Sequence, residues 1–233
     1  ELLARTREFI DRTEERFDDT AVILVEAGNY IGGQTDDATA IRRLNRMHGA
    51  YDIPNDQMIY VLSTFPVMAR RWIDHYGYRP MSDIEVQSMV RYWQRMGELM
   101  NIHDIPADYD AFAAYFDAYE REHFDYSAGG RAITDSTLDL LNSWYPAQLR
   151  PLVRWIGISL FEPHLRRALR YDDPPAIVSV GVEAVLQARK RLLRWMPARR
   201  EFTSPLEHLP MRTYPGGYDV AKVGTFPKRE TRH

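Results

Sequence analysis

Hydrophobic positions along the chain recur at intervals of three and four residues, the spacing of one face of an α-helix. No segment has the alternating pattern that is typical of a half-buried strand. The fold class is therefore predicted to be all-α, with a single globular helical domain over residues 1–196 and an irregular, extended tail over 197–233 that packs on the same domain. The expected helices cover residues 14–28, 38–48, 55–76, 82–100, 109–123, 130–144, 146–160, 161–170 and 174–196.

Local residue preferences indicate where some helices begin and end. Asn55 follows a proline and is a good N-cap, and Ser82 with Glu85 has the spacing of a capping box. Pro66 is expected to kink or end the helix that begins at Asn55, because proline lacks the backbone amide proton. In the last helix, the expected core consists of the aliphatic residues Ile177, Val178, Val182, Val185, Leu186, Leu192 and Leu193.

Composition narrows the classes of protein that the chain can belong to. With 233 residues and 45% hydrophobic content, a single domain buries roughly 70 to 75% of its unfolded surface, enough to enclose a cofactor. The chain has no cysteine, which excludes disulfides, thiolate-ligated haem, iron–sulfur clusters and cysteine zinc sites. The net charge of -3 gives no reason to expect nucleic acid as a partner. No apolar stretch is long enough to span a membrane, and we expect a cytoplasmic protein.

One histidine falls on the apolar face of a short helix. Positions i, i+3, i+4 and i+7 of residues 41–48 share one face, and they are occupied by Ile41, Leu44, Asn45 and His48. The imidazole of His48 is therefore predicted to face inward. An inward histidine is either a packed core residue or a ligand, and the spacing alone favours the core residue.

The preceding helix carries a cation and a hydroxyl one turn apart. Arg16 and Thr20 lie one above the other, and the next five residues, 21–25, are apolar all round, as in a buried helix. An arginine at the mouth of such a helix can donate to a bound oxygen species. The alternative is that Arg16 pairs with a neighbouring acidic residue on a solvated surface.

Two further patterns have a structural and a functional interpretation. Glu120 and His123 have the Glu-x-x-His spacing of di-iron bundles, but the second copy that such a bundle needs is missing, so a solvated helix end is favoured. His75, His103 and His164 are expected to have no ligand role.

The basic run 189–194 is interpreted as a helix end that interacts with the helix dipole, or as a contact with lipid headgroups that would make the protein membrane-peripheral.

Four segments in a fixed order resemble those of one family of helical oxygenases. They are residues 16–20 (Arg-Phe-Asp-Asp-Thr), 44–65, 77–85 and 100–106. In their order and spacing, the chain resembles the all-helical family that contains the rubber oxygenase (latex-clearing protein) and the fungal MpaB-type oxygenases. The likeness runs from about Arg16 into the segment 212–218.

The resemblance implies a b-type haem whose iron is held by one axial histidine, with an arginine and a threonine on the other side. These roles would fall on His48 as the ligand of the iron, and on Arg16 and Thr20, which would stabilise charge on bound dioxygen. Rubber oxygenase has a lysine just before the threonine, where this chain has Asp19. Asn45 or a backbone carbonyl would fix the tautomer of the histidine. The expected apolar walls are Leu24, Met47, Phe65 and Trp72.

By analogy, the expected function is haem-dependent cleavage of a carbon–carbon double bond by dioxygen, in an apolar, isoprenoid-like substrate. Two other classes stay open. The first is a haem-binding sensor or carrier that is not an oxygenase. The second is a cofactor-free helical interaction protein, in which His48 is a packed core residue.

Overall fold

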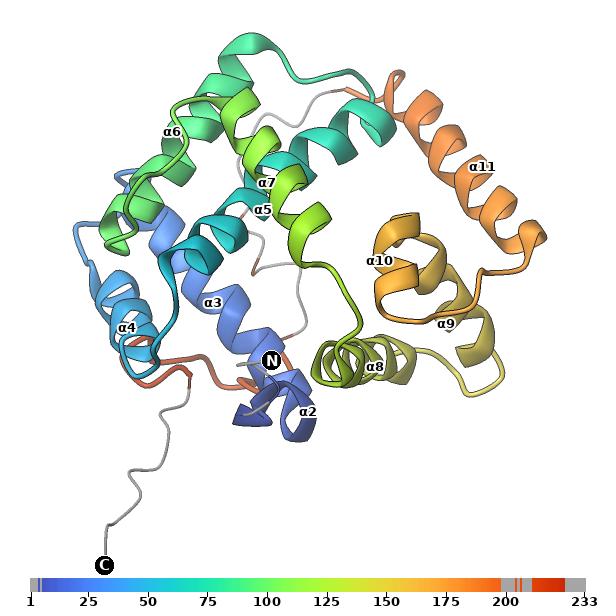
Figure 1. Cartoon of the computed structure of the whole chain (residues 1–233), viewed down its shortest axis with the longest axis horizontal. Helices are drawn as coiled ribbons and strands as arrows, with labels where there is room; N and C mark the ends of the chain where they lie inside the picture. Colours follow the sequence, from blue (N-terminus) through green and yellow to red (C-terminus); the bar gives the residue numbers. More distant parts are fainter. Residues whose placement is uncertain (1–3, 5, 198–203, 205, 207–210, 225–233) are drawn as a thin grey trace, which may run out of the picture. The chain divides into compact units, whose positions relative to one another are not determined.

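The computed structural model describes residues 4, 6–197, 204, 206 and 211–224, and it confirms the all-α fold class. In this part of the chain there are ten helices and no strand (Figure 1). The helices are α2 (Glu8–Asp11), α3 (Thr13–Ile31), α4 (Thr39–His48), α5 (Asn55–Tyr76), α6 (Asp83–Leu99), α7 (Tyr109–His123), α8 (Ala128–Ser143), α9 (Arg150–Ser159), α10 (Pro163–Ala168) and α11 (Ala176–Leu193). None of these helices has the length and apolarity that a membrane crossing needs.

The chain divides into two compact units. The first, which we call the α3–α7 unit, contains residues 15–74, 80–119 and the described part of 198–233. The second, the α8–α11 unit, contains the described part of 1–14 together with 75–79 and 120–197. All the residues that the sequence assigns to a haem site belong to the α3–α7 unit.

Local residue preferences correctly predict where α6 begins, but they do not predict that α5 continues through a proline. Ser82 and Glu85 form the predicted capping box: the serine hydroxyl accepts from the amide of Glu85, and the glutamate carboxylate accepts from the amide of Ser82. The prediction for Pro66 allowed a kink or an end, and α5 does not end there but continues to Tyr76. Pro66 is fully buried, and tertiary packing of this kind offsets the hydrogen bond that proline cannot donate.

All five helices of the α3–α7 unit contribute to its core, with Leu62, Met96 and Phe112 among the most buried side chains. Gly97 on α6 marks a close approach within it. A Cβ atom at this position would lie 2.7 Å from Leu62 Cδ2 and 2.7 Å from Ile105 Cδ1. The missing side chain therefore lets α6 pack tightly against α5 and the loop that follows α6.

The last helix differs from the prediction, because α11 has no buried residue. Ile177, Val185 and Leu192 were expected in the core but are 83%, 68% and 63% exposed. The side of α11 that is held in place carries Glu183, whose carboxylate accepts from the hydroxyl of Tyr76 at 2.8 Å. Because the helix has apolar residues on two sides, periodicity alone could not tell which side packs. The other four expected core residues are half-buried: Val178, Val182, Leu186 and Leu193.

The close approach at Gly97 gives a test of the packing. We expect Gly97→Val to lower the free energy of unfolding by about 1–3 kcal/mol, because two core side chains must move to admit it. The matched control is Gly181→Val on α11, where a Cβ meets nothing within 4 Å, and its effect should stay within about 0.5 kcal/mol. Urea denaturation followed by circular dichroism measures both, and equal effects would contradict the packing described for Gly97.

Candidate cofactor site

His48 is the last residue of α4, and its Nδ1 atom is shielded from solvent without a hydrogen-bond partner in the described part of the chain. Burial lowers the pKa of His48 from its ordinary value of 6.5, and the positive charge of Arg16 lowers this pKa further. The imidazole is therefore neutral at neutral pH. A neutral imidazole whose nitrogen has no competing partner is the form that ligates iron.

Arg16 lies on α3 and is half-buried. Its Nη1 atom is 3.6 Å from Oδ2 of Asp19, and 3.8 Å from the position that a Cβ atom would take at Gly224. Its positive charge also contributes to the lowered pKa of His48. The cation and the histidine that the sequence singled out thus lie on consecutive helices, α3 and α4.

Thr20 and Asn45 make contacts that the sequence did not indicate. The Thr20 hydroxyl donates to the backbone carbonyl of Arg16 at 2.8 Å, and the residue is exposed. The Asn45 amide donates to the carbonyl of Leu99 at 2.7 Å, at the C-terminus of α6. It makes no hydrogen bond to Nδ1 of His48, and its role in fixing the tautomer of the histidine stays a prediction. The last carbonyls of a helix lack a partner within the helix, and Asn45 supplies one.

The expected wall residues lie at different places in the α3–α7 unit. Leu24 on α3 is half-buried. Met47 packs in a second, smaller core cluster with Val22, Ile23 and Val223. Phe65 on α5 stacks on Trp93 of α6, with ring centroids 4.2 Å apart.

The same face of α5 that carries Phe65 is otherwise open. Val61, Met68 and Trp72 lie at helical spacing from Phe65 and are exposed. This exposed apolar face and the half-buried His48 belong to one unit. Of the groups that can hold a nitrogen-ligated metal cofactor, this unit offers the neutral imidazole of His48, the cation of Arg16 and exposed apolar side chains on α5.

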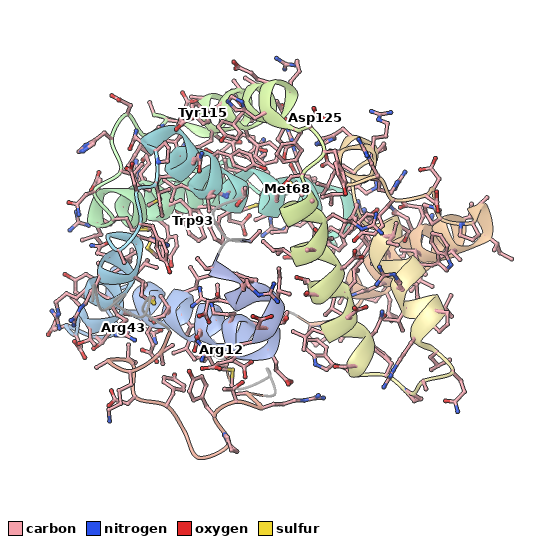
Figure 2. The ribbon with its side chains drawn as sticks, turned by 60° about the horizontal axis from the view of Figure 1, so that its bottom comes forward. Arg12, Arg43, Met68, Trp93, Tyr115 and Asp125 are labelled. Carbon is pink, nitrogen blue, oxygen red and sulfur yellow. The ribbon has the colours of Figure 1, made fainter. Side chains whose placement is uncertain are left out.

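Residues 211–224, which we call the C-terminal strap, contribute contacts that sequence reasoning missed. The amide of Thr213 donates to Asp18 Oδ2 at 2.9 Å, and the hydroxyl of Tyr214 donates to Asp19 Oδ1. Arg43, labelled on α4 in Figure 2, holds the other end of the strap. Its Nε donates to the carbonyl of Val223 at 2.6 Å. These pairs are about 180 to 195 residues apart in sequence, so no local pattern could have found them.

A second group of ligand-type residues lies in the α8–α11 unit. One ligand atom from each of Glu120, Glu162 and His164 falls within 4.8 Å of the others. His164 Nε2 is 2.6 Å from Glu120, whereas its Nδ1 is 3.4 Å from Glu162. The two ring nitrogens thus face different carboxylates. This bridging geometry favours a hydrogen-bonded structural triad over a metal centre, which would need both carboxylates beside one nitrogen.

The described part of the chain is an all-helical protein with a shielded histidine on α4 and a half-buried arginine on α3. A family model described as the catalytic domain of ER-bound oxygenase mpaB/B′ and rubber oxygenase matches residues 4–196. The chain therefore belongs to this oxygenase family, and the resemblance found in the sequence is confirmed.

Two curated relatives come from Penicillium brevicompactum. ER-bound oxygenase mpaB′ is 22% identical over 250 residues, which cover 100% of this chain and 56% of the relative. ER-bound oxygenase mpaB is 22% identical over 206 residues, which cover 80% of this chain and 52% of the relative. The chain spans about half the length of both relatives.

The pKa of His48 makes part of the stability dependent on pH. The unfolded chain has the ordinary histidine pKa of 6.5 and the folded protein a lower one, so below about pH 6.5 the unfolded state binds more protons. The contribution of neutral His48 to the free energy of unfolding is therefore complete above about pH 6.5. It is lost as the pH falls toward the lower pKa that His48 has in the folded protein.

We expect His48→Gln to flatten the dependence of the unfolding free energy on pH between about pH 7 and pH 5. Urea denaturation at a series of pH values measures this dependence. The control is His103→Gln, since the side chain of His103 is exposed. The same slope in both variants would show that the pKa of His48 is not lowered by folding.

Proposed function

We propose that this protein is a haem-b-dependent oxygenase in which His48 is the axial ligand of the iron. The observation that carries the proposal is the shielded Nδ1 of His48, which has no hydrogen-bond partner in the described part of the chain. A buried polar atom without a partner is costly, and a bound metal removes that cost. Haem would supply an iron that binds and activates dioxygen.

The residues around His48 would have separate roles. Burial, and then the charge of Arg16, lower the pKa of His48 and favour the neutral imidazole. The Arg16 guanidinium offers N–H donors that would stabilise negative charge in a site that excludes water. The Thr20 hydroxyl donates to its own helix and can rotate to act as a second donor. Met47 and Leu24 would keep water away from this side of α3 and α4.

An apolar, isoprenoid-like alkene is the substrate class that we propose. The exposed apolar face of α5 supports it, because Val61, Met68 and Trp72 offer a surface that favours hydrocarbon over water. The family description also names a rubber oxygenase. In the proposed reaction the carbon–carbon double bond is broken and each carbon receives one oxygen atom of dioxygen. Two carbonyl groups form, so no external reductant is consumed.

Absorption spectroscopy of the protein reconstituted with haem tests the role of His48. We expect a Soret band that is lost or shifted in His48→Ala and unchanged in His103→Ala, whose side chain is exposed. We also expect the loaded protein to consume dioxygen and form carbonyl products when an isoprenoid alkene is added. Arg16→Gln should slow this turnover by about 10²-fold or more, as loss of a charge-stabilising donor does in other enzymes.

The other outcomes identify the two alternative classes. A stable dioxygen adduct without alkene turnover would favour a haem-binding sensor or carrier. No Soret band in the parent or in His48→Ala, with both proteins folded, would refute haem binding and leave a cofactor-free helical protein.

We also propose that the protein contacts membranes peripherally through α11. Large apolar side chains are exposed along this helix, and Trp195 just beyond its end is 87% exposed. Arg189 and Arg191 are exposed at the same end. Such a combination of apolar, aromatic and basic residues suits an anionic lipid interface. The two relatives are named ER-bound oxygenases, and the expected cytoplasmic location stays a prediction.

Sedimentation with lipid vesicles tests this contact. We expect the protein to bind vesicles that contain phosphatidylserine, and we expect Leu192→Ser with Trp195→Ser to weaken binding about tenfold or more, since both side chains would leave the lipid. Leu152→Ser on α9, which is also exposed, is the matched control. If the parent does not bind vesicles but forms oligomers that the double variant fails to form, the exposed face of α11 would instead be an interface with a second copy of the chain.

A further inference from the structure

A small polar cavity lies beside the C-terminal end of α3, and it shares no residue with the expected haem site. Its volume is about 210 Å³. Pockets for drug-sized ligands have roughly 300–1,000 Å³, so this one suits a ligand with fewer atoms. The described residues that line it all belong to the α3–α7 unit. They include no lysine, arginine or histidine, and they are Glu26, Asn29, Gln34, Thr35, Asp37, Thr39, Ala40 and Val220.

The chain reverses its direction beside α3 because of one glycine. Gly33 has a φ of +70°, which glycine adopts without strain. Its amide donates to the carbonyl of Tyr30, and the amide of Gln34 donates to the carbonyl of Asn29 at 2.8 Å. These two bonds are the pattern of a Schellman motif. The motif ends α3 and brings side chains of the segment 34–37 to the same cavity as Asn29.

Glu26 places a negative charge in the cavity and forms no ion pair within the part of the chain that the structure describes. Its side chain is half-buried, and both of its hydrogen-bond partners are neutral. The Tyr218 hydroxyl donates to Oε1 at 2.7 Å, and the Asn29 amide donates to Oε2 at 3.3 Å. Burial, and then the hydrogen bond to Glu26, raise the pKa of Tyr218 to about 12, so the phenol stays protonated. The last turn of α3 has no basic residue, and the negative end of the helix dipole adds to the charge of Glu26.

Asp37 supplies a second negative charge at the exposed rim of the cavity. Its Oδ1 atom accepts from the amide of Thr39 at 2.9 Å and from Nη2 of Arg42 at 3.3 Å. The hydrogen bonds from Thr39, and then the charge of Arg42, lower the pKa of Asp37, so this carboxylate is ionised at neutral pH. Arg42 does not line the cavity. Two carboxylates and one guanidinium therefore leave an excess of negative charge.

We propose that this cavity binds a small organic cation that carries a primary ammonium group. An ammonium has three N–H donors and no acceptor, and the lining offers carboxylate, amide and hydroxyl oxygens that accept from it. The charge of the ligand would compensate for Glu26, and a short aliphatic chain would contact Ala40 and Val220, the apolar residues of the lining. A calcium ion, whose oxygen ligands lie at about 2.3–2.6 Å, would fill only a small part of the cavity.

Isothermal titration calorimetry of the full chain with putrescine, a short aliphatic diamine, tests the proposal. We expect putrescine to bind and its diol analogue, in which hydroxyl groups replace both ammonium groups, not to bind. Glu26→Gln and Asp37→Asn should each weaken binding about threefold or more, because each removes one charge and keeps an acceptor. Thermal melting followed by circular dichroism shows whether both variants are folded.

Asp36→Asn is the matched control. Asp36 is exposed and precedes Asp37 in the chain, but it does not line the cavity. Its substitution changes the net charge of the protein by the same amount and should leave the affinity for putrescine unchanged. Equal weakening by Asp36→Asn and Asp37→Asn would mean that an acidic surface attracts the diamine without a defined site, and this result would overturn the proposal.

Arg42→Gln gives a change in the opposite direction. It removes the guanidinium that pairs with Asp37, so putrescine should bind more tightly, and unchanged or weaker binding would contradict a ligand at Asp37. Absence of heat with putrescine would refute the proposal, and binding of calcium chloride in its place would reassign the cavity to a metal ion. None of these variants alters a residue of the expected haem site, so the outcome is independent of the proposed function.

Discussion

The pair of buried carboxylates on α3 is the constraint on which the rest of the α3–α7 unit depends. Asp18 and Asp19 are adjacent, and only 3% and 1% of their surfaces are exposed. Removal of two neighbouring charges from water is costly unless each finds a donor. The strap supplies both donors, an amide for Asp18 and a hydroxyl for Asp19. A segment some 195 residues later in the chain must therefore return to α3.

The return of the strap has consequences for the candidate site. Its residue Val223 completes a small apolar cluster with Val22 and Ile23 of α3, and Gly224 lies beside Met47 and Arg16. Asp19 forms an ion pair with Arg16 at 3.6 Å, and the charge of Arg16 adds to the effect of burial in lowering the pKa of His48. The strap thus reaches the surroundings of Arg16 and of Met47, the residue next to His48.

The sequence predicts the helices well because their signals are local. The capping box at Ser82 and the inward face that carries His48 are matched by the structure. The missed features depend on pairs far apart in the chain, such as Tyr214 with Asp19 and Glu120 with His164. The exposed apolar face of α11 was missed for another reason. A helical period shows which residues share a face, but not what covers that face.

The position of Asp19 answers a question that the resemblance raised, because rubber oxygenase has a lysine there. In this chain the carboxylate is directed to Tyr214 of the strap and to Arg16, and it is buried. A lysine could accept no hydrogen bond from the tyrosine and would repel the arginine. Aspartate in place of lysine therefore changes the interactions at this position. It belongs with Tyr214 and the strap, and together they give Arg16 surroundings that a lysine could not provide.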